Sequence, residues 1–224
     1  MMRKSLFVLS LCGALAGPFL GQILLASESD TGPVPAAELK PTIANGDAEA
    51  GAASSAVCAG CHGVDGIGTI PTNPNLAAQG ASYMVKQLME FKSGVRENAI
   101  MAGMVAALSP DDMENLAAHY AQQTAPTGES VNENLELGRQ IYQGGITSIG
   151  VPACSGCHAP DGAGNDAAKF PRLGGQKAEY IVKALQDFRS GARANDPGKM
   201  MQMVSQRMSD GEIAAVANYV QGLY

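Results

Sequence analysis

The sequence predicts an all-α fold made of two small domains in tandem, and three observations support this. Apolar residues recur at helical spacing in each half, and no stretch alternates apolar and polar residues as a half-buried strand does. Residues 76–98 align without a gap on residues 173–195, so one module occurs twice. Each half also ends in an apolar helical pattern that opens with a capping box.

The central helix of the first half is expected to end at Gly94, a plausible C-cap. Its apolar positions are Tyr83, Val85, Leu88 and Phe91. The second half repeats this pattern before Gly191, with Tyr180, Val182, Leu185 and Phe188. The last helices are expected to follow Ser109 and Ser209, whose capping boxes are completed by Asp112 and Glu212.

The composition of the chain indicates where these domains begin and end. We expect domains at 46–123 and 131–224, joined by the linker 124–130, TAPTGES. Residues 27–45 are rich in proline and small residues, which is typical of a tether.

Residues 1–26 are expected to be an export signal or an N-terminal membrane anchor. A basic start at Arg3 and Lys4 precedes 22 residues without charge, Ser5–Ala26. That stretch is long enough to span a bilayer, although Gly17-Pro18 would kink it. We favour a cleaved signal over a retained anchor. Either segment places the folded part in the periplasm, free or attached to the outer face of the cytoplasmic membrane.

Composition excludes some functions and suggests a cofactor. The net charge is −6, and removing residues 1–26 takes away two positive charges and no acid, which leaves −8. Such a chain offers no basic surface for nucleic acid. Aromatic residues make up only 5% and tryptophan is absent, so a bulky apolar group that is not an amino acid would help to fill the cores.

The pattern Cys-x-x-Cys-His occurs twice, at Cys58, Cys61 and His62 and at Cys154, Cys157 and His158. In an exported protein, two thiols at this spacing can add across the vinyl groups of haem, and the adjacent imidazole can ligate the iron. A zinc site is disfavoured because the two Cys pairs lie far apart. A thioredoxin-like redox pair is disfavoured because no β-α-β pattern surrounds it. A local disulfide would not need a His twice in the same place. The sequence thus predicts two covalently bound haem c groups.

The histidine count limits the second axial ligand of each iron. The chain has three histidines, and His119 is interpreted as a surface or interdomain residue. Methionine is the natural alternative. Four methionines at apolar helix positions are interpreted as core residues: Met84, Met89, Met113 and Met208. Superposing the two capping boxes pairs Met101 with Met201, each eight residues before its serine N-cap, so we select these two. A register one residue shorter would pair Met104 with Met203.

A haem-ligating histidine usually donates its other ring N–H to a fixed acceptor. Pro74 and Pro171 occupy the same place in both repeats and are candidates to present a carbonyl there. Shaping of the loop is an equally good explanation of these prolines.

With these motifs identified, the chain resembles the cytochrome c4 family of dihaem, exported class I cytochromes c. The resemblance covers roughly residues 45–224 and rests on GDAEAG, VCAGCHGVDG, PACSGCHAPDG, FPRLGGQ, the LxxQxxYxxKxLxxF helices and the capping boxes. It implies two cytochrome c domains related by a pseudo-twofold axis, with the haems near the interface. It also implies thioether links at the four cysteines and His–Met ligation by His62 with Met101 and by His158 with Met201.

By this resemblance the protein is an electron carrier, not an enzyme. It would carry electrons from a quinol:cytochrome c reductase towards a terminal oxidase, a cbb3-type oxidase being one candidate. An alternative is the electron-accepting subunit of a periplasmic dehydrogenase, of the flavocytochrome c type. A dihaem peroxidase is a weaker alternative, because the matched Met101 and Met201 would close both irons.

Overall fold

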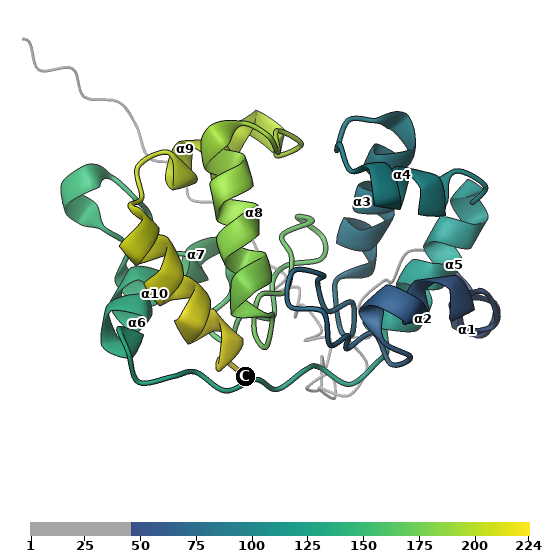
Figure 1. Cartoon of the computed structure of the whole chain (residues 1–224), viewed down its shortest axis with the longest axis horizontal. Helices are drawn as coiled ribbons and strands as arrows, with labels where there is room; N and C mark the ends of the chain where they lie inside the picture. The colour runs from purple at the N-terminus through teal and green to yellow at the C-terminus, as the bar shows by residue number, and fades with distance from the viewer. Residues whose placement is uncertain (1–45) are drawn as a thin grey trace, which may run out of the picture. The chain divides into compact units, whose positions relative to one another are not determined.

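The computed structural model describes residues 46–224, which form two helical halves of similar build (Figure 1). The first half contains α1 (Ala48–Ser54), α2 (Ala56–His62), α3 (Ala81–Ser93), α4 (Ala99–Val105) and α5 (Pro110–Ala121). The predicted export segment, 1–26, and tether, 27–45, lie outside the described residues.

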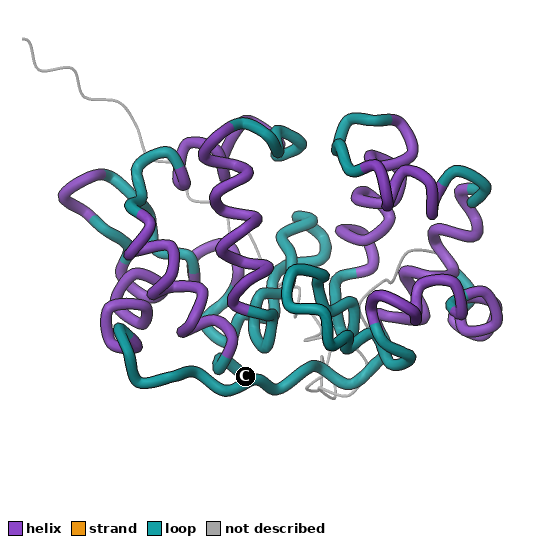
Figure 2. Tube along the Cα trace, viewed as in Figure 1, coloured by secondary structure: helices purple, strands orange, loops and turns teal. Residues whose placement is uncertain are grey.

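The second half repeats this order with α6 (Leu135–Gly144), α7 (Ser155–His158), α8 (Ala178–Ser190), α9 (Met200–Ser205) and α10 (Asp210–Gln221). It adds two short 3₁₀ helices, η1 (Thr147–Ile149) and η2 (Pro197–Lys199). Loops make up the rest of the described trace (Figure 2), where two isolated β-bridges occur and no strand. The all-α prediction is confirmed. No helix between residues 46 and 224 is long and apolar enough to cross a membrane.

The predicted helix ends are present in the structure. Ser109 Oγ accepts a hydrogen bond from the N–H of Asp112, whose carboxylate accepts one from the N–H of Ser109. Ser209 and Glu212 form the same capping box at α10. Gly94 and Gly191 end α3 and α8 in the left-handed region, which glycine adopts without strain.

In each half the first and last helices cross closely, and a glycine permits the approach. A Cβ at Gly51 of α1 would lie 2.0 Å from the carbonyl oxygen of Asn115 in α5. A Cβ at Gly138 of α6 would lie 2.1 Å from the carbonyl oxygen of Ala215 in α10. Any larger residue would therefore push the two helices apart. Beside these crossings lie separate apolar cores, which include Leu116, Tyr120, Ile141, Tyr142 and Ile213.

Three of the four methionines predicted to be core residues are buried: Met84, Met113 and Met208. The prediction for Met89 is wrong, because its side chain is 42% exposed. Its buried neighbours in α3 are Met84, Gln87 and Phe91, so the face that carries Met89 points away from the core. A polar residue, Gln87, takes the buried position, which apolar periodicity could not indicate.

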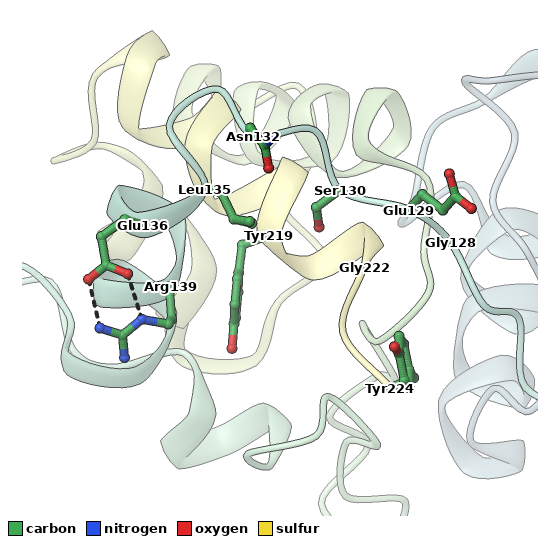
Figure 3. Close-up of a pocket in the computed structure, with 10 residues that line it drawn as sticks. All are labelled: Gly128, Glu129, Ser130, Asn132, Leu135, Glu136, Arg139, Tyr219, Gly222 and Tyr224. Atoms are coloured by element: carbon green, nitrogen blue, oxygen red, sulfur yellow. Dashed lines mark hydrogen bonds and ion pairs between the residues drawn. The ribbon is translucent and has the colours of Figure 1, made fainter.

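The predicted linker, 124–130, runs along α10 and is hydrogen-bonded to it. Ser130 Oγ donates to the carbonyl of Asn218 at 2.8 Å, and Gln221 Nε2 donates to the carbonyl of Glu129 at 2.7 Å. An open pocket lies between the end of the linker, α6 and α10, with Tyr219 in its wall (Figure 3). None of the predicted haem-binding residues lines this pocket.

We expect Gly138→Ala to lower the free energy of unfolding by about 1–3 kcal/mol, the usual cost of overpacking a tight contact. Gly144→Ala is the matched control, since Gly144 lies in the same helix with nothing within 4 Å of an added Cβ. Denaturant unfolding of the haem-loaded protein, followed by circular dichroism, measures both. Equal midpoints for the two variants would show that the α6–α10 crossing does not need a glycine.

Candidate haem-binding sites

The first Cys-x-x-Cys-His motif lies within α2. Cys58, Cys61 and His62 all belong to this helix, which ends at His62 because Gly63 follows with a φ of 81°. Cys58 is partly buried against the core of the first half, whereas Cys61 is exposed. One turn of helix thus presents two thiols and an imidazole in sequence order.

The second motif forms the shorter helix α7. Cys154 is its N-cap, Cys157 and His158 lie inside it, and Ala159 ends it with a φ of 66°. Cys154 is partly buried and Cys157 is exposed, which matches the first motif. All four thiols are free. Burial raises the pKa of the Cys154 thiol to about 11.

Each motif histidine is held by a proline carbonyl from the loop that follows. His62 Nδ1 lies 2.8 Å from the Pro74 oxygen, and His158 Nδ1 lies 3.0 Å from the Pro171 oxygen. A carbonyl can only accept, so Nδ1 must carry the proton and Nε2 keeps its lone pair. The structure thereby confirms the carbonyl-presenting interpretation of both prolines.

Both imidazoles are buried and in the chemical state that a metal ligand requires. Each side chain is 7% exposed. Burial lowers the pKa of His62, against the opposing effect of its hydrogen bond to Pro74. Burial also lowers the pKa of His158. A neutral ring with a free Nε2 is the form that binds a metal.

The methionines selected from the sequence differ in exposure from their alternatives. Met101 in α4 is partly buried and packs against the cluster of Phe91, Val105 and Met113, and Met201 in α9 is also partly buried. Met104 is 42% exposed and Met203 51% exposed. The helices follow the register that pairs Met101 with Met201. In this register Val105 corresponds to Ser205, and both residues are fully buried.

The third histidine, His119, is half-buried where α5 crosses α1. Its ring and its carbonyl both pair with the side chain of Gln123 in the same half. These contacts lie within the first half and the side chain is only partly buried, so the structure favours the interpretation of His119 as a surface residue over that of an interdomain residue. A tight helix crossing depends on long-range packing, and one sequence does not reveal it.

Three buried side-chain polar atoms have no hydrogen-bond partner within residues 46–224: Asn75 Oδ1, the Tyr120 hydroxyl and Arg172 Nε. Sequence reasoning missed all three. Asn75 and Arg172 directly follow Pro74 and Pro171, so their shared place in the repeat was the available signal. The Nε of Arg172 is a donor, which a carboxylate of a haem could satisfy, whereas the hydroxyl of Tyr120 lies beside Cys58. The two thiols and the buried imidazole of each motif fit a haem in each half.

Comparisons with known proteins agree with this chemistry. The family model for cytochrome c matches residues 48–123 and again 135–224. Cytochrome c4 of Azotobacter vinelandii is 42% identical over 191 residues, which covers 81% of this chain and 91% of that protein. The thiosulfate dehydrogenase electron acceptor of Stutzerimonas stutzeri is 40% identical over 149 residues, with 65% of this chain and 68% of that protein covered.

The crystal structure of reduced recombinant cytochrome c4 from Pseudomonas stutzeri has the same fold. It superposes with a TM-score of 0.78 at 43% identity, and the match covers 80% of this chain and all of that one. Two tandem cytochrome c domains related by pseudo-twofold symmetry are thus established, each with its own haem c bound covalently. The chain belongs to the cytochrome c4 family and is a dihaem electron-transfer protein rather than an enzyme.

Proposed function

We propose that each half holds its haem through the motif found in the sequence. One haem would be held by thioether links to Cys58 and Cys61, with His62 and Met101 ligating its iron. The other would be held by Cys154 and Cys157, with His158 and Met201 ligating its iron. The observation that carries the assignment is the duplicated site: free thiols beside a buried imidazole whose Nδ1–H is donated to a proline carbonyl.

When bound, haem iron accepts and releases one electron, and the chain's own residues keep that exchange reversible. The Pro74 and Pro171 carbonyls fix the tautomer and the orientation of the two imidazoles. An iron that is ligated by both a histidine and a methionine would have no free position for a substrate. The sulfur of methionine also raises the reduction potential relative to a second histidine.

We propose that the carrier works in a periplasmic respiratory chain, from a quinol:cytochrome c reductase towards a terminal oxidase. In this arrangement residues 1–26 are the export signal or anchor, and 46–123 and 131–224 are the two domains. The two regions matched by the cytochrome c family model support the domain division. The match to a thiosulfate dehydrogenase electron acceptor favours a second candidate, the electron acceptor of a periplasmic dehydrogenase.

The surface beside the motifs suits brief contacts with partners. Val57 in α2 is 57% exposed and Val64 just after it is 78% exposed. Ala59, Ala153 and Ala159 next to the motif residues are partly buried. Small apolar groups of this kind can contact a partner without the large buried area that a permanent complex needs.

A redox titration of the purified protein, monitored by absorption, tests the assignment of electron transfer. We expect two one-electron steps.

The mass of the denatured polypeptide should exceed the mass calculated from its sequence by two haems, because thioether bonds survive unfolding. One haem, or haem lost on denaturation, would contradict attachment at all four cysteines.

Met101→Ala and Met201→Ala should each remove about half of the sulfur-to-iron charge-transfer band, since each variant leaves one of two His–Met irons intact. Met104→Ala is the control and should leave the band unchanged, because Met104 is exposed. Absorption spectra of the oxidised proteins measure this. Loss of the band in Met104→Ala would assign the ligand to the other register.

Docking to a reductase is expected to be transient and moderately dependent on salt. With a charge of −8 after loss of residues 1–26, the chain favours a basic partner surface, and screening weakens that attraction. Stopped-flow reduction across a salt series should therefore show rates that fall as salt rises. A complex that survives gel filtration at high salt would favour the dehydrogenase acceptor instead.

A further inference from the structure

The two halves hold each other through a pair of glutamines that act in opposite directions. Gln79 of the first half accepts a hydrogen bond from the N–H of Arg172 at 2.7 Å and donates to the carbonyl of Arg172 at 3.1 Å. Gln176 of the second half does the same to Asn75, at 2.8 Å and 3.0 Å. We call Gln79 and Gln176 the crossed glutamine pair.

Each glutamine is hydrogen-bonded to the residue that follows a proline in the other half. The carbonyl of that proline accepts the hydrogen bond from the motif histidine of the other half. Arg172 follows Pro171, whose carbonyl accepts from His158. Asn75 follows Pro74, whose carbonyl accepts from His62. A proline carbonyl belongs to the same planar peptide as the N–H of the next residue, so fixing that N–H also fixes the carbonyl.

These contacts are buried, which makes them costly to lose. Gln79 is 7% exposed and Gln176 is 4% exposed. Each amide uses its oxygen and its nitrogen on one residue, and its oxygen also accepts from the N–H that follows, at Gly80 and Lys177. An aliphatic side chain would leave a buried N–H and C=O unpaired, which costs more than an ordinary hydrogen bond contributes.

We propose that the crossed glutamine pair positions the histidine ligands across the domain interface, so that each domain completes the haem site of the other. Gln79 acts on His158 through Pro171, and Gln176 acts on His62 through Pro74. The proposal rests on the assignment of both histidines as iron ligands. A firm acceptor for Nδ1–H makes the imidazole a stronger electron donor and stabilises the oxidised iron.

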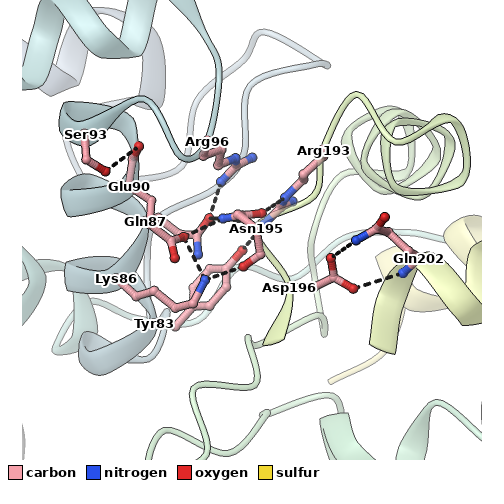
Figure 4. Close-up of polar contacts among 10 residues, drawn as sticks. All are labelled: Tyr83, Lys86, Gln87, Glu90, Ser93, Arg96, Arg193, Asn195, Asp196 and Gln202. Carbon is pink, nitrogen blue, oxygen red and sulfur yellow. Dashed lines mark hydrogen bonds and ion pairs between the residues drawn. The ribbon is translucent and has the colours of Figure 1, made fainter. Parts of the chain in front are cut away.

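A third glutamine at the interface provides the matched control. Gln87 is 6% exposed, like the pair, and its Oε1 accepts from Arg96, Arg193 and Asn195 (Figure 4). These partners are side chains, and none of them lies in the loop that carries Pro74 or the loop that carries Pro171. Gln87→Ala therefore weakens the interface without releasing either proline carbonyl.

The test follows the histidine Nδ1–H groups of the full haem-loaded chain by NMR after ¹⁵N-histidine labelling. The chain has only three histidines, so His119 serves as an internal reference. In Gln79→Ala we expect the Nδ1–H of His158 to exchange with solvent about tenfold faster, because the variant loses the hydrogen bond from the Arg172 N–H that fixes the Pro171 carbonyl. His62 should not change. Gln176→Ala should show the reverse, and Gln87→Ala neither.

The same samples give a second readout through redox titration. Each histidine signal broadens when its own iron is oxidised, so it reports the potential of that iron. Gln79→Ala should raise the potential of the His158 iron alone, because a weaker Nδ1–H bond destabilises the oxidised state. If Gln79→Ala does not fold, Gln79→Asn keeps the amide but shortens the side chain by one methylene, which withdraws its oxygen from the Arg172 N–H, and it should change the same site.

The outcomes separate this proposal from the ligand assignment. Wild-type protein in which either motif histidine lacks a haem-shifted signal would overturn the assignment of the ligands. Correct wild-type signals with changes in the same half, in both halves equally, or in neither would overturn the crossed action alone. An effect of Gln87→Ala equal to that of Gln79→Ala would reduce the pair to an ordinary interface contact.

Discussion

The hydrogen bond from each buried imidazole to a proline carbonyl constrains the path of the loop between the histidine and the proline. The two partners lie only 12 residues apart in the first half and 13 in the second, so the loop between them must turn back on itself. Glycines with positive φ make those turns, including Gly66 and Gly162. The N–H of Leu76 and that of Leu173 then bond to the carbonyls of these two glycines, which closes each loop. A flexible loop would leave the imidazole without a hydrogen-bond acceptor in a fixed position.

Duplication of the module supplied an interface that is partly symmetric. Arg96 stacks on Phe91 and donates to Tyr180, and Arg193 stacks on Phe188 and donates to Tyr83. Both arginines thus cover the helix end of their own half and bond the other half. This is the reciprocity expected when two copies of one surface meet around a twofold axis.

Other contacts across the interface occur in one direction only. Asp166 accepts hydrogen bonds from the N–H and the hydroxyl of Ser82 at the start of α3. Lys177 donates to the carbonyls of Ile70 and Asn73 in the first half's loop. The residue after the proline is neutral in the first half and cationic in the second. The two haem sites therefore share the Cys-x-x-Cys-His motif but differ in the charges around it. Two identical copies of the module would have had the same electrostatic surroundings.

The sequence predicted what depends on local pattern. Capping boxes, glycine C-caps and the place of Pro74 and Pro171 each need only a few neighbouring residues. It did not predict the crossed glutamine pair, whose partners are 93 to 101 residues apart. It also misplaced Met89, since apolar periodicity cannot show that Gln87 is the buried residue of its turn. Apolar periodicity predicts buried helix positions only where the buried residues are apolar, so it fails where polar side chains are buried at an interface.

The polar character of this interface has a physical consequence for a two-haem carrier. Apolar surfaces attract without direction, whereas buried hydrogen bonds hold only in one geometry. Arg193 is 8% exposed and is satisfied by Tyr83, Gln87 and Asn195 rather than by a carboxylate. A displacement of one half relative to the other would leave the buried guanidinium of Arg193 without its hydrogen-bond partners. The free-energy cost of a displaced interface is therefore large. A covalent linker alone limits how far the domains separate, and the directional contacts select one orientation among those the linker allows.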